Sequence, residues 1–146
     1  MSSPEGSTLT FRHRARDLRP VALKRFALQV QAMISKGRPF DCLVTGDAEM
    51  RRLNRDFRGK DYATDVLSFP APGGERLGDI AISAARARAQ ARQYGHEAED
   101  EVRVLLLHGL LHLMGMDHEA DSGAMARAEK RWRARLGLPQ TLTERQ

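Results

Sequence analysis

The sequence predicts an α+β fold, a small mixed β-sheet packed with helices around a central apolar helix. Two observations point to this class: short strand-like segments alternate with segments whose apolar residues recur every three or four positions, and residues 102–114 are apolar nearly all round. The length of 146 residues is that of one compact domain. We expect a single domain over residues 1–146, with residues 1–8 and 141–146 disordered.

The first predicted elements are a strand and a helix. Residues 8–16 alternate loosely between apolar and polar positions, which predicts a strand with Leu9 and Phe11 facing the core. Pro20 opens a helix that ends at Gly37, because proline is favoured in the first helical turn. This helix carries one apolar stripe for packing, made of Leu23, Phe26, Ala27, Val30, Met33 and Ile34.

The next predicted pair is a short strand at residues 40–45 and a helix that runs to about Phe57. Gly46 and Asp47 supply the turn between them and the N-cap of the helix. The buried face of the helix is predicted to consist of Met50, Leu53 and Phe57. Another face is a basic ridge made of Arg51, Arg55 and Arg58.

Two strands, residues 65–69 and 77–82, are predicted on either side of a proline- and glycine-containing loop at residues 72–74. We expect these strands to pair as neighbours. Ser83 is the predicted cap of an alanine- and arginine-rich helix that ends at Gly95.

The segment 97–100 puts acidic side chains at the start of the central helix, where negative charge favours the helix N-terminus, and the helix reaches about Met114. A last amphipathic helix is predicted from Asp121, and Gly137 and Pro139 stop it. Its apolar side is formed by Met125, Ala128 and Trp132.

The composition limits the compartment and the partners. Lysine and arginine number 24 and aspartate and glutamate 19, so the formal net charge is +5, which favours polyanionic partners. The single cysteine, Cys42, excludes an internal disulfide and a cysteine-based zinc cluster and fits a reducing cytosol. Residues 1–8 lack the order of a secretory signal, and the apolar run at 104–116 is too short to span a bilayer. We expect a cytoplasmic protein without a membrane partner.

The candidate chemistry lies in three histidines at residues 108–118. His108 and His112 are four residues apart on a helix, so they differ by about 40° in azimuth and about 6 Å in rise and can face one metal ion. Gly115 allows the chain to reverse and bring back His118 as a third ligand. Three nitrogens leave a fourth tetrahedral position for water, which predicts one catalytic Zn²⁺ per chain.

A hydrogen-bonded core residue is the common role of a single histidine on an apolar helix. Three at this spacing in the most apolar segment favour a metal site, because buried imidazoles without partners are costly. His13 and His96 are expected to be solvated.

The same histidine spacing occurs in metzincin proteases, in which a glutamate general base follows the first histidine. Here that position is Gly109. The missing carboxylate argues against peptide hydrolysis.

Three motifs together carry a resemblance to a known family. They lie at residues 53–70, 77–80 and 108–118, and their order and spacing resemble the YbeY family of bacterial rRNA-maturation endoribonucleases over about half of the chain. The sequence departs from the family pattern at Ala63, where the family has proline, and at Met116, where it has tyrosine. Neither position is a metal ligand.

The resemblance implies a single-strand-specific, metal-dependent endoribonuclease that acts in 16S rRNA 3′-end maturation, rRNA processing and ribosome quality control. Its partners would be single-stranded RNA and the small ribosomal subunit, with no DNA. By motif position, the resemblance makes His108, His112 and His118 the zinc ligands, and it makes Arg58 and His112 the catalytic residues. Zinc and a guanidinium both suit the charge that develops in phosphodiester cleavage.

Four further residues are candidates for binding the RNA backbone or for supporting the cleft. Arg51 and Arg55 either track the RNA backbone or form a solvated ridge. Asp65 and Ser68 could support the cleft, although Asp65 could instead cap the turn that enters a strand. The low aromatic content of 5% suggests that base stacking is a minor part of recognition.

The general base is left unassigned: the candidates are Asp79, Asp117 and Glu119, and the alternative is the RNA's own 2′-hydroxyl acting as nucleophile. Two other functions compete with the nuclease. One is a ribosome-assembly or RNA-binding factor with a structural zinc, and the other is a zinc hydrolase of a non-RNA substrate.

Overall fold

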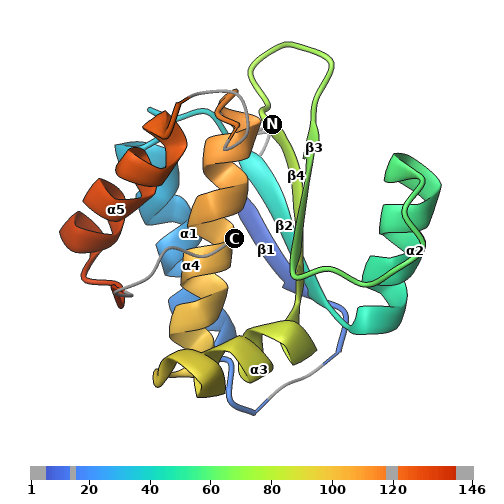
Figure 1. The fold of residues 1–146 in the computed structure, drawn as a ribbon. Coiled ribbons are helices and arrows are strands. Elements are labelled where there is room, and N and C mark those ends of the chain that lie inside the picture. Colours follow the sequence, from blue (N-terminus) through green and yellow to red (C-terminus); the bar gives the residue numbers. More distant parts are fainter. Residues whose placement is uncertain (1–5, 14–15, 118–121, 141–146) are drawn as a thin grey trace.

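The computed structural model describes residues 6–13, 16–117 and 122–140. Within these residues the chain forms four strands and five helices (Figure 1). In chain order they are β1 (Thr8–Phe11), α1 (Pro20–Met33), β2 (Phe40–Thr45), α2 (Asp47–Arg58), β3 (Val66–Pro70), β4 (Gly78–Ser83), α3 (Ala84–Tyr94), α4 (Ala98–Leu113) and α5 (Ala124–Leu136). No helix in the described part of the chain is long and apolar enough to cross a membrane.

The four strands form one mixed sheet in the order β1-β2-β4-β3. β1, β2 and β4 run parallel, and β3 pairs antiparallel with β4, with Val66 opposite Ile82 and Pro70 opposite Gly78. The predicted α+β class and the predicted pairing of these two neighbours are therefore confirmed. β3 lies at one edge of the sheet, and its position at that edge decides where the site forms.

Helices cover the two faces of the sheet unequally (Figure 1). α1 and α4 pack against one face, and α5 packs on α4, whereas α2 lies on the opposite face. The alternation of side chains along β4 follows this division. Ile80 and Ile82 join the main core with α4, and Ala81 joins a smaller cluster with Met50 and Leu67.

The apolar helix α4 is buried as predicted, because its leucines and valines contact both the sheet and the other helices. The preceding helix, α3, begins and ends at the residues predicted from local signals. The Ser83 hydroxyl accepts a hydrogen bond from the Arg86 backbone N–H at 3.1 Å, and Gly95 ends α3 in the left-handed conformation with φ of 76°. Gly137 ends α5 in the same way.

Some expectations about the termini and loops are wrong. Thr8 begins β1 and Ser7 is buried, where its hydroxyl accepts a hydrogen bond from the Phe40 backbone N–H, so the ordered chain starts before residue 8. β1 ends at Phe11 and does not continue to residue 16. By contrast, the N-cap of α2 is Gly46, one of the two residues predicted to supply this turn and cap, so that prediction is confirmed. Residues 141–146 lie outside the described residues, as does Asp121, and α5 begins at Ala124.

Two helix faces also differ from the prediction, for a common reason. Met33 and Phe57 are 40% and 69% exposed, because each lies in the last turn of its helix, where the surface beneath it ends. In α2 the buried polar residue is Asn54, whose side-chain amide donates to the Tyr62 carbonyl at 2.9 Å. Asn54 thus ties the end of α2 to the loop that follows it.

His96 is not solvated as expected. Its side chain is 9% exposed, and Nε2 lies 2.6 Å from Oε1 of Glu101, which is fully buried. The physical reason is the close turn between α3 and α4, which folds the histidine against the first turn of the next helix. His13 is exposed, as predicted.

A charged cluster joins the start of α1 to the start of α4 and makes stability depend on pH. The Glu99 carboxylate accepts hydrogen bonds from the Arg19 guanidinium and backbone N–H and from Arg103, which lowers the pKa of Glu99 below its usual 4.5. A lowered folded-state pKa adds stability above the unfolded value, and this stability is lost as the pH falls through the folded-state value. We expect urea unfolding at about pH 7 and about pH 3 to show a smaller acid-induced loss in Glu99→Gln than in wild type. An equal loss in both proteins would contradict this role.

Candidate functional site

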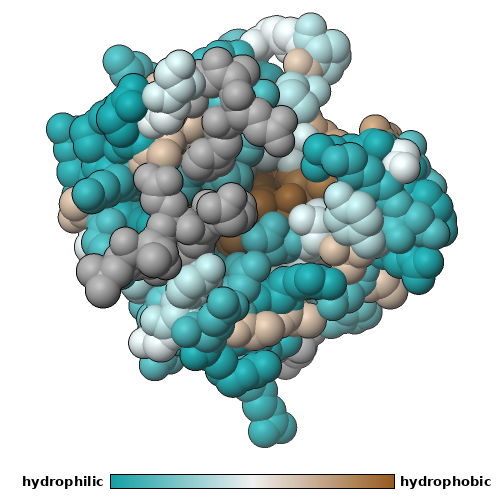
Figure 2. All heavy atoms as spheres, in the orientation of Figure 1, coloured by the Kyte–Doolittle hydropathy of each residue, from teal (hydrophilic) through white to brown (hydrophobic). Residues whose placement is uncertain are grey.

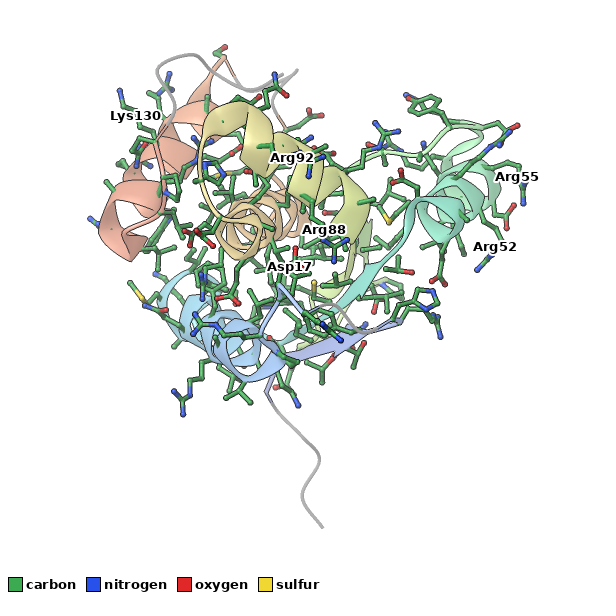
Figure 3. The ribbon with its side chains drawn as sticks, turned by 90° about the horizontal axis from the view of Figure 1, so that it is seen from below. Asp17, Arg52, Arg55, Arg88, Arg92 and Lys130 are labelled. Atoms are coloured by element: carbon green, nitrogen blue, oxygen red, sulfur yellow. The ribbon has the colours of Figure 1, made fainter. Side chains whose placement is uncertain are left out.

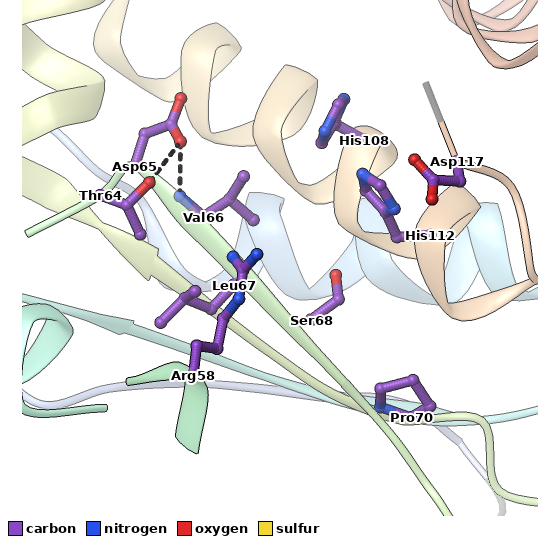
Figure 4. Close-up of a pocket in the computed structure, with 10 residues that line it drawn as sticks. All are labelled: Arg58, Thr64, Asp65, Val66, Leu67, Ser68, Pro70, His108, His112 and Asp117. Carbon is purple, nitrogen blue, oxygen red and sulfur yellow. Dashed lines mark hydrogen bonds between the residues drawn. The ribbon is translucent and has the colours of Figure 1, made fainter. Parts of the chain in front are cut away.

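A cleft of about 510 Å³ lies along the edge strand β3, between the C-terminal half of α4 and the end of α2. Figure 4 shows the residues around it. The lining consists of Arg58, Thr64, Asp65, Val66, Leu67, Ser68, Pro70, His108, His112 and Asp117. The structure therefore brings five candidates from distant parts of the sequence to one place: Arg58, Asp65, Ser68, His108 and His112.

The two histidines project from one side of α4 into this cleft. Their ring centroids are 4.7 Å apart with the ring planes at 68°, as expected for positions four apart on a helix (Figure 4). Both residues are partly exposed, although the helix around them is buried. The pair therefore lines the cleft beside β3.

Glu129 of α5 orients the first histidine. Its Oε1 lies 2.8 Å from Nδ1 of His108, its Oε2 accepts a hydrogen bond from Arg133 at 3.1 Å, and the residue is only 4% exposed. An ionised carboxylate can only accept, so this contact places the imidazole proton on Nδ1 and the lone pair on Nε2. In zinc sites a carboxylate commonly accepts a hydrogen bond from the histidine ring nitrogen that does not bind the metal.

Sequence reasoning missed Glu129, which lies 21 residues from the histidine it contacts. A signal was available, because it shares the spacing of the apolar side of the last helix with Met125, Ala128 and Trp132. An acidic residue on the packing side of a helix needs a buried partner.

The candidate ligands among the described residues are of the kinds that bind zinc. Two imidazoles share one side of a helix, one of them is oriented by a carboxylate, and Asp117 lies on the His112 side of the same cleft (Figure 4). His118, the third predicted ligand, lies outside the described residues. Within the described residues, which leave it out, no three potential ligands form a metal-binding group.

Gly109, which replaces the glutamate of the proteases, is in close contact with the sheet. A Cβ atom there would lie 2.9 Å from Cγ2 of Ile80, 3.2 Å from Oγ of Ser68 and 3.3 Å from Cγ2 of Val66. Its carbonyl accepts a hydrogen bond from the Ser68 hydroxyl at 2.9 Å. A side chain at this position would force Ile80, Ser68 or Val66 to move, so packing disfavours the glutamate that the proteases have here.

This packing predicts a measurable cost for the smallest substitution. Gly109→Ala should lower the free energy of unfolding by roughly 1–3 kcal/mol, because overpacking outweighs the gain in helix propensity. Urea unfolding would measure this loss. A Gly109→Ala variant as stable as the wild type would contradict the close packing.

Arg58 is the last residue of α2 and reaches the cleft around the edge of the sheet (Figure 4). Gly59 stops the helix directly after it in the left-handed conformation, with φ of 70°. The Asn54 bond to the loop holds this end of the helix in place. The guanidinium is thus carried by a fixed backbone opposite the histidines.

Asp65 and Ser68 reach the cleft from the two ends of one short segment. Asp65 is held by its neighbours, because its Oδ1 accepts from the Val66 N–H at 2.8 Å and its Oδ2 from the Gln90 amide at 3.1 Å. It therefore caps the turn into β3 and lines the cleft at the same time. The Ser68 hydroxyl joins β3 to α4 through the Gly109 carbonyl.

The other arginines of the predicted ridge do not line the cleft. Arg51 pairs with Asp61 at 2.8 Å and Arg55 with Asp56 at 3.2 Å, and both arginines are more than half exposed. Figure 3 shows Arg55 directed away from the body of the molecule. All three arginines belong to α2, but only Arg58 lines the cleft.

Comparison with known proteins identifies the family of the chain. The family model described as Endoribonuclease YbeY matches residues 10–137. A protein named Endoribonuclease YbeY from Solibacter usitatus is 64% identical over 145 residues, which cover 99% of this chain and 98% of the relative. Another of that name, from Koribacter versatilis, is 53% identical over 103 residues, covering 70% of this chain and 68% of the relative.

A solved structure supports the fold. The solution structure of TM1509 from Thermotoga maritima matches with a TM-score of 0.60 at 24% identity, over 94% of this chain and 99% of that one. At this identity the likeness concerns the fold alone. The family model and the relatives, which extend over most of the chain, decide the assignment. The chain belongs to the YbeY endoribonuclease family, a family of nucleases that act on RNA.

Proposed function

We propose that this protein is a zinc-dependent, single-strand-specific endoribonuclease that acts in 16S rRNA 3′-end maturation, rRNA processing and ribosome quality control in the cytoplasm. One observation carries the proposal. Arg58 and the histidine pair oriented by Glu129 line the same cleft, so a cation and candidate metal ligands meet on opposite sides of a site that is open to solvent.

The metal ligands in this proposal are His108, His112 and His118. When bound, zinc would polarise a phosphoryl oxygen or lower the pKa of a water molecule. The chain's own contribution is to present the imidazoles. Glu129 keeps the His108 proton on Nδ1, and the Ser68 bond to Gly109 fixes α4 against the strand along which the RNA would lie.

Arg58 is proposed to bind the phosphate that is cleaved. The reaction adds negative charge to the phosphorus oxygens in the transition state, and a guanidinium can donate two hydrogen bonds to them. Its place at the capped end of a helix keeps it in position before the RNA arrives. Less reorganisation is then needed during the reaction.

The structure narrows the choice of general base. Of the carboxylates considered, Asp117 lines the cleft, whereas Asp79 lies outside it and pairs with Arg76. Glu119 lies outside the described residues. We therefore propose Asp117 as the general base, which would accept the proton of the attacking group, whether that group is a water molecule or the 2′-hydroxyl of the RNA.

The decisive experiment measures cleavage of end-labelled RNA by the purified protein. We expect single-stranded RNA to be cut, duplex RNA of the same sequence to be spared, and a chelator to abolish cleavage until Zn²⁺ is restored. Metal analysis before and after chelation checks that the ion was removed. Cleavage that survives complete metal removal would contradict the proposal. A protein that binds the small ribosomal subunit without cutting RNA would instead be an assembly factor with a structural zinc.

A further inference from the structure

A second hollow adjoins the cleft on the other face of the sheet. This groove has a volume of about 800 Å³ and lies between the sheet and the last turns of α2. Arg58, Ser68 and Pro70 line both the groove and the cleft. The two spaces therefore meet around the edge strand β3. In Figure 2 hydrophobic residues lie in a hollow between the α4 side of the molecule and the hydrophilic surface of α2, where the edge of the sheet lies.

The groove has an aromatic wall. Phe57 is 69% exposed and contacts Phe69 of β3, with ring centroids 5.4 Å apart and ring planes at 63°. Leu53 and Ala81 continue the apolar surface. A phenylalanine this exposed leaves most of its ring open to a ligand, and its edge contact with Phe69 limits the ring's freedom.

Charged residues of both signs line the groove, and Asp79 lies opposite Phe69 in the β3–β4 pair. Arg58 lies where the groove joins the cleft, and Asp41 and Asp79 lie among its other lining residues. Arg76 binds both of these carboxylates, each at 2.5 Å. Two carboxylates bridged by one cation leave this region net negative, which repels phosphate groups. A sugar-phosphate backbone would therefore stay on the Arg58 side, and only an uncharged group would enter the groove.

We propose that this groove is a nucleobase subsite. While the phosphate beside Arg58 occupies the cleft, one neighbouring base leaves the single strand and packs against Phe57 and Phe69. The inference rests on the proposed function, because it assumes RNA in the cleft. It also revises the expectation from composition, since few aromatic residues suffice when two of them stand beside the cleft.

A base-deletion experiment tests this inference. The probes are a short fluorescein-labelled single-stranded RNA and versions of it that carry one abasic nucleotide at successive positions. Their affinities and cleavage rates are measured for wild type, Phe57→Leu and Phe57→Trp. The leucine keeps an apolar side chain but removes the ring, and the tryptophan keeps a ring. Thermal unfolding checks that the exposed position tolerates both changes.

The expected result is specific to one nucleotide. Phe57→Leu should bind the intact RNA about tenfold more weakly, because base–aromatic stacking is worth that much or more. It should bind as the wild type does when the abasic nucleotide occupies the sensitive position. Phe57→Trp should bind intact RNA at least as tightly as wild type does. RNA binding should also quench the fluorescence of the introduced tryptophan, measured as the loss beyond that of the wild type, which contains only Trp132.

Two results would overturn the inference while the proposed function stands. In the first, the wild type cleaves RNA and Phe57→Leu binds every probe as tightly as the wild type does. In the second, Phe57→Leu weakens all probes by the same factor, which would exclude a base in the groove. If the wild type neither binds nor cleaves the intact RNA, the proposed function fails, and the subsite fails with it.

Discussion

Replacing His112 with alanine is expected to abolish RNA cleavage, by roughly a thousandfold or more, and to leave the chain folded. The loss follows from the proposed zinc site, since a catalytic metal supplies several kcal/mol of transition-state stabilisation and each 1.36 kcal/mol is a factor of ten in rate. The fold should survive because the core around α4 consists of leucines and valines, while the His112 side chain faces the cleft.

Three measurements on the same preparation separate loss of zinc, loss of the fold and loss of activity. Zinc content should fall in His112→Ala, circular dichroism should match that of the wild type, and cleavage of labelled single-stranded RNA should disappear. His13→Ala is the matched control, because His13 is exposed and does not line the cleft. A variant that loses zinc and unfolds would mean that the metal is structural. A variant that loses zinc and still cleaves would refute a catalytic metal.

Arg58→Ala is expected to lower kcat/KM for RNA cleavage by about 10²–10³, the usual effect of removing one donor to a developing anionic oxygen. Arg58→Lys should recover only part of this loss, since an ammonium group keeps the charge but lacks the two-pronged geometry of a guanidinium. If the arginine acts in the transition state, the loss should lie mainly in kcat.

The same helix offers a control for Arg58. Arg55→Ala removes the same charge three residues earlier, from a side chain that is exposed, paired with Asp56 and outside the cleft. It should change kcat less than twofold or so, because surface charges of this kind contribute little beyond long-range attraction. Equal losses in the two variants would show that net charge matters and that the position of Arg58 does not.

Elements with local signals could be predicted from the sequence. Ser83 and Gly95 bound α3 through contacts within one turn of the helix, and α4 is recognised by apolar residues on all sides. The exposed Phe57 and the buried Asn54 could not be predicted in this way. Both fit the apolar side of α2 by spacing, and which of them is covered depends on where the sheet ends beneath the helix.

The same distinction applies to the site. The i, i+4 spacing of His108 and His112 places them together on any helix, so their proximity was predictable. The approach of Arg58 to them depends on the antiparallel edge strand β3 between two helices on opposite faces, and strand order cannot be derived from the pattern. Spacing alone also grouped Arg51 and Arg55 with Arg58, since periodicity does not show where a helix ends relative to the sheet.

The contact between Glu129 and His108 couples metal binding at the site to the packing of the last helix, α5. Glu129 belongs to α5, the last helix of the described chain, and His108 to the site. By thermodynamic linkage, whatever raises the metal affinity of His108 through this contact must also strengthen the docking of α5, by the same free energy. The last helix is then a part of the ion's binding equilibrium. Bound zinc should slow hydrogen exchange throughout α5, including backbone amides far from any ligand.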